Sequence, residues 1–160
     1  MRALDRYNLL LALLLALLLW LNQQPAEEPR PLLQIDAMQI KEIRVVRDRH
    51  LRLSLLRDTQ GWMLMHPNIE RAAVKRAGTL LGLLHAPSHW QTQADTATLQ
   101  TYGLEQPVLS ISFDDNAIHF GDASVPPGRR YVLVKNQVHL IDENYFRIAS
   151  LPAKHFREQP

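Results

Sequence analysis

The 160-residue chain contains no cysteine, so disulfide bonds, thiol catalysis, cysteine-ligated zinc and lipid attachment through a thiol are all excluded. It has six glycines, and they form none of the patterns that cradle a phosphate group. The formal net charge is +2, from 18 basic and 16 acidic residues, which is too small to favour a nucleic-acid partner. A domain built from this chain must therefore rely on its hydrophobic core for stability.

One long hydrophobic run is present, at residues 9–21 (LLLALLLALLLWL). Arg2 and Arg6 precede it, and a basic segment followed by an apolar run is typical of a secretory signal. No small-x-small cleavage site follows, so we expect residues 1–22 to form an uncleaved signal anchor. A membrane span usually needs about 20 apolar residues, and interfacial aromatic residues such as Trp20 can compensate for a shorter run. A cleaved signal and a buried core helix are the alternatives.

The bias of basic residues toward the start of the chain predicts a cytoplasmic N-terminus, with the rest of the chain outside the cytoplasm. Residues 23–31 are rich in proline and glutamate and are interpreted as a linker. About 130 residues follow, which is enough for one domain with a substantial core. We expect the folded domain at residues 32–151 and a short tail at residues 152–160.

Hydrophobic periodicity predicts an α+β domain. Alternating apolar residues indicate paired strands at 51–55 and 62–65, and an apolar stripe that follows Asn68 predicts a helix ending near Ala86. The remaining expected elements are one or two short strands within 32–46, strands at 108–113, 117–120, 131–134 and 138–141, a short helix at 96–102 and a closing helix at 144–151. Because hairpins join most strands, we expect an antiparallel sheet with helices packed on one face. A degenerate internal repeat of two strand-then-helix blocks is an open alternative.

Three stretches of the chain carry a resemblance to a known family. The first stretch is the N-terminal anchor with the strand pair that follows it. The second is a Gly-Trp element before the long helix, Gly61-Trp62-x-Leu64-x-x-Pro67. The third is a Tyr-Gly-Leu element before the later strands, Tyr102-Gly103-Leu104-x-x-Pro107, which is followed by a Phe120-Gly121-Asp122 turn and Arg130-Tyr131-Val132. In these features the chain resembles an uncharacterised family of bacterial membrane-anchored proteins, a domain-of-unknown-function family. Some of its members are encoded beside auxiliary components of gliding-motility-type ABC transporters. The resemblance implies a fold and a place in the bacterial inner membrane, and it brings no catalytic residues.

Histidines and carboxylates are the candidate catalytic or metal-binding groups. His85 and His89 have the spacing of zinc ligands on a helix, but a proline lies between them and the glutamate of an H-E-x-x-H motif is absent. His119 and His139 are expected in mid-strand, where they could face each other across the sheet. The adjacent acids at 114–115 are more typical of a solvated turn. We therefore predict no catalytic residue, no metal site and no cofactor.

Five residues are the candidates for contact with a partner or ligand: Trp90, Arg129, Arg130, Arg44 and Arg47. Trp90 lies between polar neighbours. Arg129 and Arg130 end a stiff proline-rich loop. Arg44 and Arg47 belong to a basic segment that could meet lipid headgroups or an acidic partner. We predict a non-enzymatic, single-pass inner-membrane protein whose periplasmic domain binds another envelope or inner-membrane protein, such as an accessory subunit of a transporter-like assembly. The alternatives are a small-ligand or glycan-binding module and an envelope hydrolase that uses the histidines with Asp114 or Asp142.

Overall fold

The computed structural model describes residues 11–17 and 30–158. Residues 11–17 form a helix whose side chains are exposed, so this part of the apolar run is not buried in the core of the domain. The other residues of the expected anchor, and residues 23–29 of the expected linker, lie outside the described residues. Among the helices that the structure describes, none is both long enough and apolar enough to cross a bilayer.

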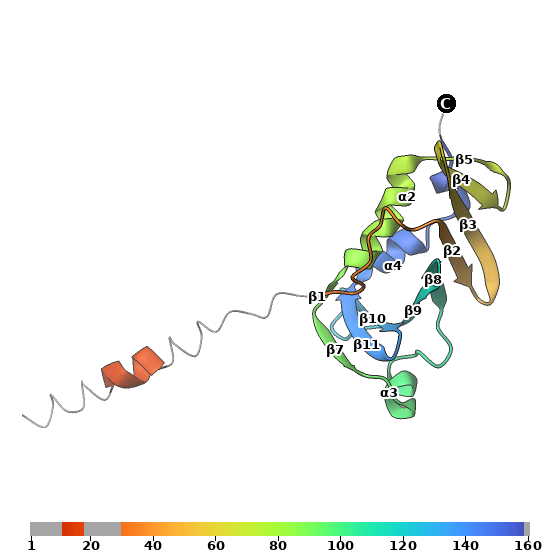
Figure 1. Ribbon diagram of the computed structural model, residues 1–160. Coiled ribbons are helices and arrows are strands. Elements are labelled where there is room, and N and C mark those ends of the chain that lie inside the picture. The colour runs from red at the N-terminus through yellow and green to blue at the C-terminus, as the bar shows by residue number, and fades with distance from the viewer. Residues whose placement is uncertain (1–10, 18–29, 159–160) are drawn as a thin grey trace, which may run out of the picture.

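The domain is built on a nine-stranded sheet in which every neighbouring pair is antiparallel, with the order β5-β4-β3-β2-β8-β9-β10-β11-β7 (Figure 1). A separate two-stranded pair joins β1 to β6. The elements are β1 Arg30–Pro31, β2 Glu42–Arg47, β3 His50–Asp58, β4 Gly61–His66, β5 Glu70–Ala72, α2 Val74–Leu81, the 3-10 helix η1 Gly82–His85, β6 Pro87–Ser88, β7 Trp90–Gln93, α3 Thr96–Thr101, β8 Leu109–Phe113, β9 Asn116–Ala123, β10 Arg129–Val134, β11 Gln137–Asp142, α4 Glu143–Ala149 and the 3-10 helix η2 Ala153–Phe156. The mixed α+β class and the antiparallel, hairpin-built sheet are therefore confirmed.

The sheet has two halves with the same order of elements. In the first half, β2 to β5 form a meander that leads into α2; in the second half, β8 to β11 form a meander that leads into α4. The first strands of the two halves, β2 and β8, pair antiparallel at the centre of the sheet, with Ile43 opposite Phe113. This mirrored arrangement is what an internal repeat would produce.

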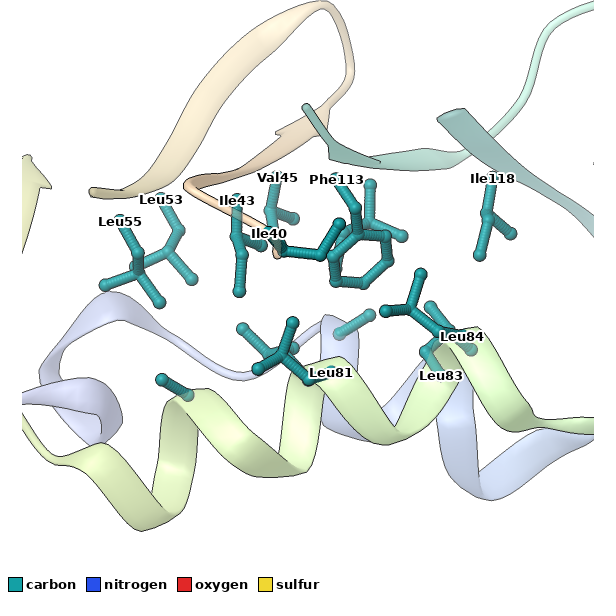
Figure 2. Close-up of a cluster of buried hydrophobic side chains, with 14 of the residues drawn as sticks. Ile40, Ile43, Val45, Leu53, Leu55, Leu81, Leu83, Leu84, Phe113 and Ile118 are labelled. Atoms are coloured by element: carbon teal, nitrogen blue, oxygen red, sulfur yellow. The ribbon is translucent and has the colours of Figure 1, made fainter. Parts of the chain in front are cut away.

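The main hydrophobic core lies between the sheet and the helices α2 and α4, which contact each other. Figure 2 shows the side chains of Leu81, Leu83 and Leu84 directed toward the apolar side chains of the central strands. Leu81 and Leu84 belong to the predicted apolar stripe, whereas Leu83 was not part of it and is buried in the 3-10 helix η1 that follows α2. Each fully buried leucine or isoleucine contributes roughly 1.5–3 kcal/mol to stability. We call the side of the sheet covered by α2 and α4 its helix face, and the opposite side its outer face.

The expectation that all helices pack on one face is only partly correct. Side chains alternate between faces along β11, so Val138 lies on the face opposite to Ile141, which belongs to the main core. Val138 is nevertheless fully buried, as is Leu104 just after α3, and neither belongs to the main core cluster. The short helix α3 also reaches the outer face, because Tyr102 at its end packs against Tyr131, whose register partner Leu140 shares a face with Val138.

The long predicted helix begins later than its stripe suggested. Residues 70–72 form the short strand β5, and α2 starts only at Val74. The apolar side chains of Ile69 and Val74 are exposed, so they contribute nothing to the buried stripe that runs from Ala77 to Leu84. Hydrophobic spacing alone could not separate these exposed residues from the buried ones.

The folded domain continues beyond residue 151. Phe156, in the segment expected to be a tail, is only 2% exposed and belongs to the main core. Arg157 forms an isolated β-bridge with Ala72, and the backbone N–H of Glu158 donates to the carbonyl of Arg71. The C-terminal segment therefore covers the β5 edge of the sheet.

Candidate functional site

Three aromatic side chains gather on the outer face of the second half: Trp90, Tyr102 and Tyr131. Tyr102 and Tyr131 are stacked, with ring centroids 4.1 Å apart and an interplanar angle of 27°. The ring of Trp90 meets both edge-on, at 5.8 Å from Tyr102 and 6.3 Å from Tyr131. We call this group the aromatic cluster. Trp90 remains 41% exposed, so the cluster has an open side.

The strand register brings two of these rings together. Leu140 of β11 lies opposite Trp90 of β7 on one side and opposite Tyr131 of β10 on the other. Residues that face each other across neighbouring strands share a face, so the three form a row on the outer face. The sequence placed Trp90 on an exposed surface, but the contribution of Tyr131 depends on long-range pairing that local periodicity does not reveal.

The third ring is positioned by α3. Asp95 caps this helix by accepting a hydrogen bond of 2.7 Å from the backbone N–H of Thr98, and that bond lowers the pKa of the Asp95 carboxyl below its ordinary value. The helix ends at Thr101 with Tyr102 as its C-cap, and Gly103 follows with a φ of +67°, a conformation that favours glycine at a helix end. The chain turns at this point, so that Leu104 is buried and Tyr102 lies against Tyr131.

The C-terminal end of α3 contacts a bulge in β9. Between Phe120 and Ala123, β9 has one residue more than the facing stretch of β10, so Gly121 and Asp122 form a bulge rather than the turn that the sequence suggested. The backbone N–H of Asp122 donates to the carbonyl of Tyr102 at 2.9 Å. A Cβ atom on Gly121 would clash with that same carbonyl oxygen. The Tyr-Gly-Leu and Phe-Gly-Asp elements of the sequence are therefore two sides of one contact.

The two arginines after the proline-rich loop have different surroundings. Arg130 points to the helix face, where its guanidinium makes two 2.9 Å hydrogen bonds to Glu143 and lies 3.7 Å from the ring centroid of Phe146. Its side chain is 13% exposed, so it joins β10 to α4. Arg129 lies opposite Asp142 in the register, is exposed, and shares the outer face with Tyr131. Of this pair, Arg129 borders the aromatic cluster.

Polar groups and a loop lie next to Arg129. His89 Nε2 lies 3.1 Å from the carboxylate of Asp142, beside Arg129 in the register. Two hydrogen bonds from Ser124 close the loop between β9 and β10. Its Oγ donates to the carbonyl of Pro126, and its backbone N–H donates to the carbonyl of Arg129. At its tip Val125 is 96% exposed.

Arg44 and Arg47 lie elsewhere. Both belong to β2, which is five strand positions from β7 in the sheet order, or about 24 Å at the usual strand spacing. Arg44 lies on the outer face and pairs with Glu42 at 2.6 Å. Arg47 lines a hollow with Arg52, His66 and the segment after α4. The structure therefore does not bring these two arginines together with each other or with Trp90.

The histidines and aspartates considered for catalysis are dispersed. His119 Nδ1 lies 2.8 Å from Ser110 Oγ on the outer face, whereas His139 Nδ1 lies 3.0 Å from Ser88 Oγ, and its partner in the register is the core residue Val132. These two histidines thus lie on opposite faces of the sheet. Burial lowers the pKa of both below the ordinary histidine value. Asp114 accepts hydrogen bonds from the backbone of Lys41 and Glu42, which is a structural role.

Within residues 11–17 and 30–158, no three histidine or acidic side chains are grouped closely enough to hold a metal ion. His85 belongs to η1 and His89 follows β6, so they do not share the helix that zinc spacing requires.

No family model, curated protein or solved structure matches the chain. The resemblance to the membrane-anchored family therefore stays a prediction.

Proposed function

We propose that this protein is a non-enzymatic, membrane-anchored envelope protein whose domain binds a partner protein through the aromatic cluster. The observation that carries the proposal is the exposed ring of Trp90, held edge-on by a stacked tyrosine pair. Tryptophan and tyrosine are enriched among the residues that dominate interface energies. Their few rotatable bonds keep the entropy cost of binding low.

The cluster is fixed before any partner arrives. Tyr102 is held by the β9 bulge and Tyr131 by the sheet register, so neither ring has to be ordered on binding. Arg129 and Asp142 supply charges at the border, where they would favour one orientation of the partner. This combination of an aromatic centre and a polar border is typical of protein interfaces.

The partner is proposed to be another protein of the envelope or inner membrane, for which this chain would act as an accessory subunit. The apolar run at residues 9–21 supports this placement, because an anchored domain meets membrane neighbours at a high effective concentration. The family resemblance points to the same kind of setting.

The test is crosslinking in intact cells followed by recovery of the full-length protein. Trp90→Ala is compared with Leu56→Ala, which removes a side chain of the first half with nearly the same exposure, 42%. We expect Trp90→Ala to reduce partner recovery about tenfold or more, as at other interface hot spots, and Leu56→Ala to leave it unchanged. The same anchor fused to an unrelated domain shows what the membrane alone recovers.

Equal recovery with both variants would refute the aromatic cluster as the binding surface. The small-ligand or glycan alternative would replace the proposal on two results together. The recovery of every crosslinked protein would have to be independent of Trp90, and an oligosaccharide would have to raise the melting temperature of the wild type but not that of Trp90→Ala.

A further inference from the structure

The two edges of the nine-stranded sheet differ in how they are covered. At one edge the C-terminal segment lies along β5, where Arg157 forms a β-bridge with Ala72 and the backbone N–H of Glu158 donates to the carbonyl of Arg71. At the other edge β7 pairs with β11 on one side, and no strand that the structure describes pairs with its second side. β7 is therefore the open edge of the sheet (Figure 1).

The hydrogen bonds of β7 identify the backbone groups on its open side. The backbone N–H of Ala94 donates to the carbonyl of Asn136 at 3.0 Å, so Ala94 faces β11. In an antiparallel strand the N–H and C=O of one residue point to the same side, and successive residues point to opposite sides. Thr92 therefore also faces β11, whereas the N–H and C=O of Gln91 and Gln93 point away from the sheet.

Gln91 lies at the centre of the open edge. The carbonyl of Gln93 lies 3.5 Å from Thr98 Oγ1, so that end of the edge adjoins the start of α3. Within the described part of the chain, the outward N–H and C=O of Gln91 have no hydrogen-bond partner, and both glutamines are exposed. β7 has the sequence WQTQ, without the charged residues or proline that commonly protect an edge strand from pairing. Such an edge is complementary to the backbone of another extended chain.

The open edge lies beside the aromatic cluster. Trp90 directly precedes Gln91, and its ring is on the outer face and 41% exposed. Residues that lie opposite each other on neighbouring strands share a face, with their Cβ atoms about 4.5–5.5 Å apart. A strand added to β7 would therefore place one side chain directly beside Trp90, and a large apolar side chain there would cover the exposed part of the ring.

We infer that the partner binds by strand addition: an extended segment of the partner protein pairs with β7 as a tenth strand, with its backbone hydrogen-bonded to Gln91 and a large apolar side chain against Trp90. The inference rests on the proposed function, because it specifies how a partner reaches the aromatic cluster. Main-chain hydrogen bonds supply affinity that depends little on sequence, and the position beside Trp90 supplies selectivity.

A second copy of this chain fits the edge less well than a partner segment does. If Gln91 of one copy paired antiparallel with Gln93 of the other, Trp90 would lie opposite Ala94. If the two Gln91 residues paired with each other, Trp90 would lie opposite Thr92. Both side chains are too small to cover an exposed tryptophan ring, so the two copies would leave the aromatic cluster open.

The first test is crosslinking of the full-length protein in intact cells with changes at Gln91. Gln91→Pro removes the outward N–H, and proline is tolerated in an edge strand where that N–H faces solvent, so the ladder with β11 stays intact. Gln91→Ala removes the same side chain but keeps the N–H. We expect Gln91→Pro to recover about tenfold less of the Trp90-dependent partner than Gln91→Ala, because a backbone acceptor of the partner loses its donor.

The second test is amide hydrogen exchange resolved to single residues, which needs no variant and decides the matter if Gln91→Pro does not fold. In the free full-length protein, the Gln91 amide should exchange faster than the Thr92 amide, which is bonded to β11. In the crosslinked complex of the wild type, exchange at Gln91 should slow about tenfold or more, because the added strand holds this N–H.

Three results would overturn the inference. The first is equal recovery with folded Gln91→Pro and Gln91→Ala, and the second is an unchanged Gln91 amide in the complex. Either would mean that the partner docks on the rings without adding a strand. The third is a slow Gln91 amide in the free protein, which would show that the edge is already filled by this chain or by a second copy. Failure of the proposed function is distinguishable, because it requires that Trp90→Ala leave partner recovery unchanged.

Discussion

The two halves of the sheet share a core but differ on the outer face. On the helix face, both halves bury apolar strand residues against a helix that follows the meander. On the outer face of the first half, Leu56 and Met65 are exposed. On the outer face of the second half, Val138 is buried and the aromatic cluster is held by Tyr102 at the end of α3.

The difference comes from one segment. Residues 87–108, between the two halves, contain β7 and α3 and supply Trp90 and Tyr102. The proposed binding surface therefore lies where the second half departs from the shared plan. A framework of two similar halves supplies the stability, and the segment between them supplies the distinctive surface.

The largest expected effect on stability is at the centre of the sheet, where β2 of the first half pairs with β8 of the second half. Phe113 is fully buried opposite Ile43 at the centre of the sheet. Phe113→Ala should lower the free energy of unfolding by about 3–5 kcal/mol, because it removes apolar contacts and leaves a cavity. Urea unfolding of the full chain in detergent measures this. A loss below about 1 kcal/mol would show that the two halves do not share one core.

A second comparison sets one ion pair from each half side by side. Arg130→Met leaves Glu143 without its partner beneath α4, and we expect a loss of about 2–3 kcal/mol. Arg44→Met breaks an exposed pair with Glu42, and we expect a much smaller loss of stability because solvent screens that pair. The same unfolding measurement applies to both, and equal losses would contradict the distinction drawn from burial.

The β9 bulge should be sensitive to a single methyl group. Gly121→Ala places a Cβ against the carbonyl of Tyr102 and should cost about 1–3 kcal/mol. It should also weaken the Trp90-dependent partner recovery, because Tyr102 would shift. Gly78→Ala is the matched control in the first half, since nothing lies within 4 Å of its added Cβ. That change should stabilise α2 by up to about 1 kcal/mol.

The smallest expected effect is a pH dependence confined to the second half. His119 and His139 have pKa values lowered by burial, so the unfolded chain binds protons at these sites more readily than the folded one. The stability they contribute is complete above the ordinary histidine value of about 6.5 and is lost as the pH falls below it, through the folded pKa values. In that lower pH range, the rate of amide hydrogen exchange in β9 and β11 should increase. His139→Gln and His119→Gln should reduce that increase, and an unchanged profile in both variants would assign it to other groups.

Much of the fold could be predicted from local patterns. The hairpin of β3 and β4, the strands β8 to β11 and the closing helix follow from alternation and turn residues, which are properties of neighbours in sequence. The strand β5 and the packing role of Phe156 were missed. Both depend on distant contacts, since β5 pairs with β4 and is covered by the C-terminal segment.

The candidate site was predictable only in part. Trp90 was singled out because a large aromatic residue stood among polar neighbours, and Arg129 because it ended a proline-rich loop. Tyr102 was noted as part of the Tyr-Gly-Leu element, and Tyr131 carried no local signal of exposure. Arg130 was grouped with Arg129, but the alternation of a strand sends adjacent side chains to opposite faces.

The sequence by itself determined most of the strands and helices and their order, most of the apolar residues of the core, and the presence of an apolar run before the domain. These depend on periodicity and on local turn chemistry. Tertiary structure alone decided that β2 and β8 pair at the centre, that α3 crosses to the outer face, and that Trp90, Tyr102 and Tyr131 meet. The reason is physical: each of these contacts joins residues distant in sequence, and only the register of the folded sheet brings them within reach.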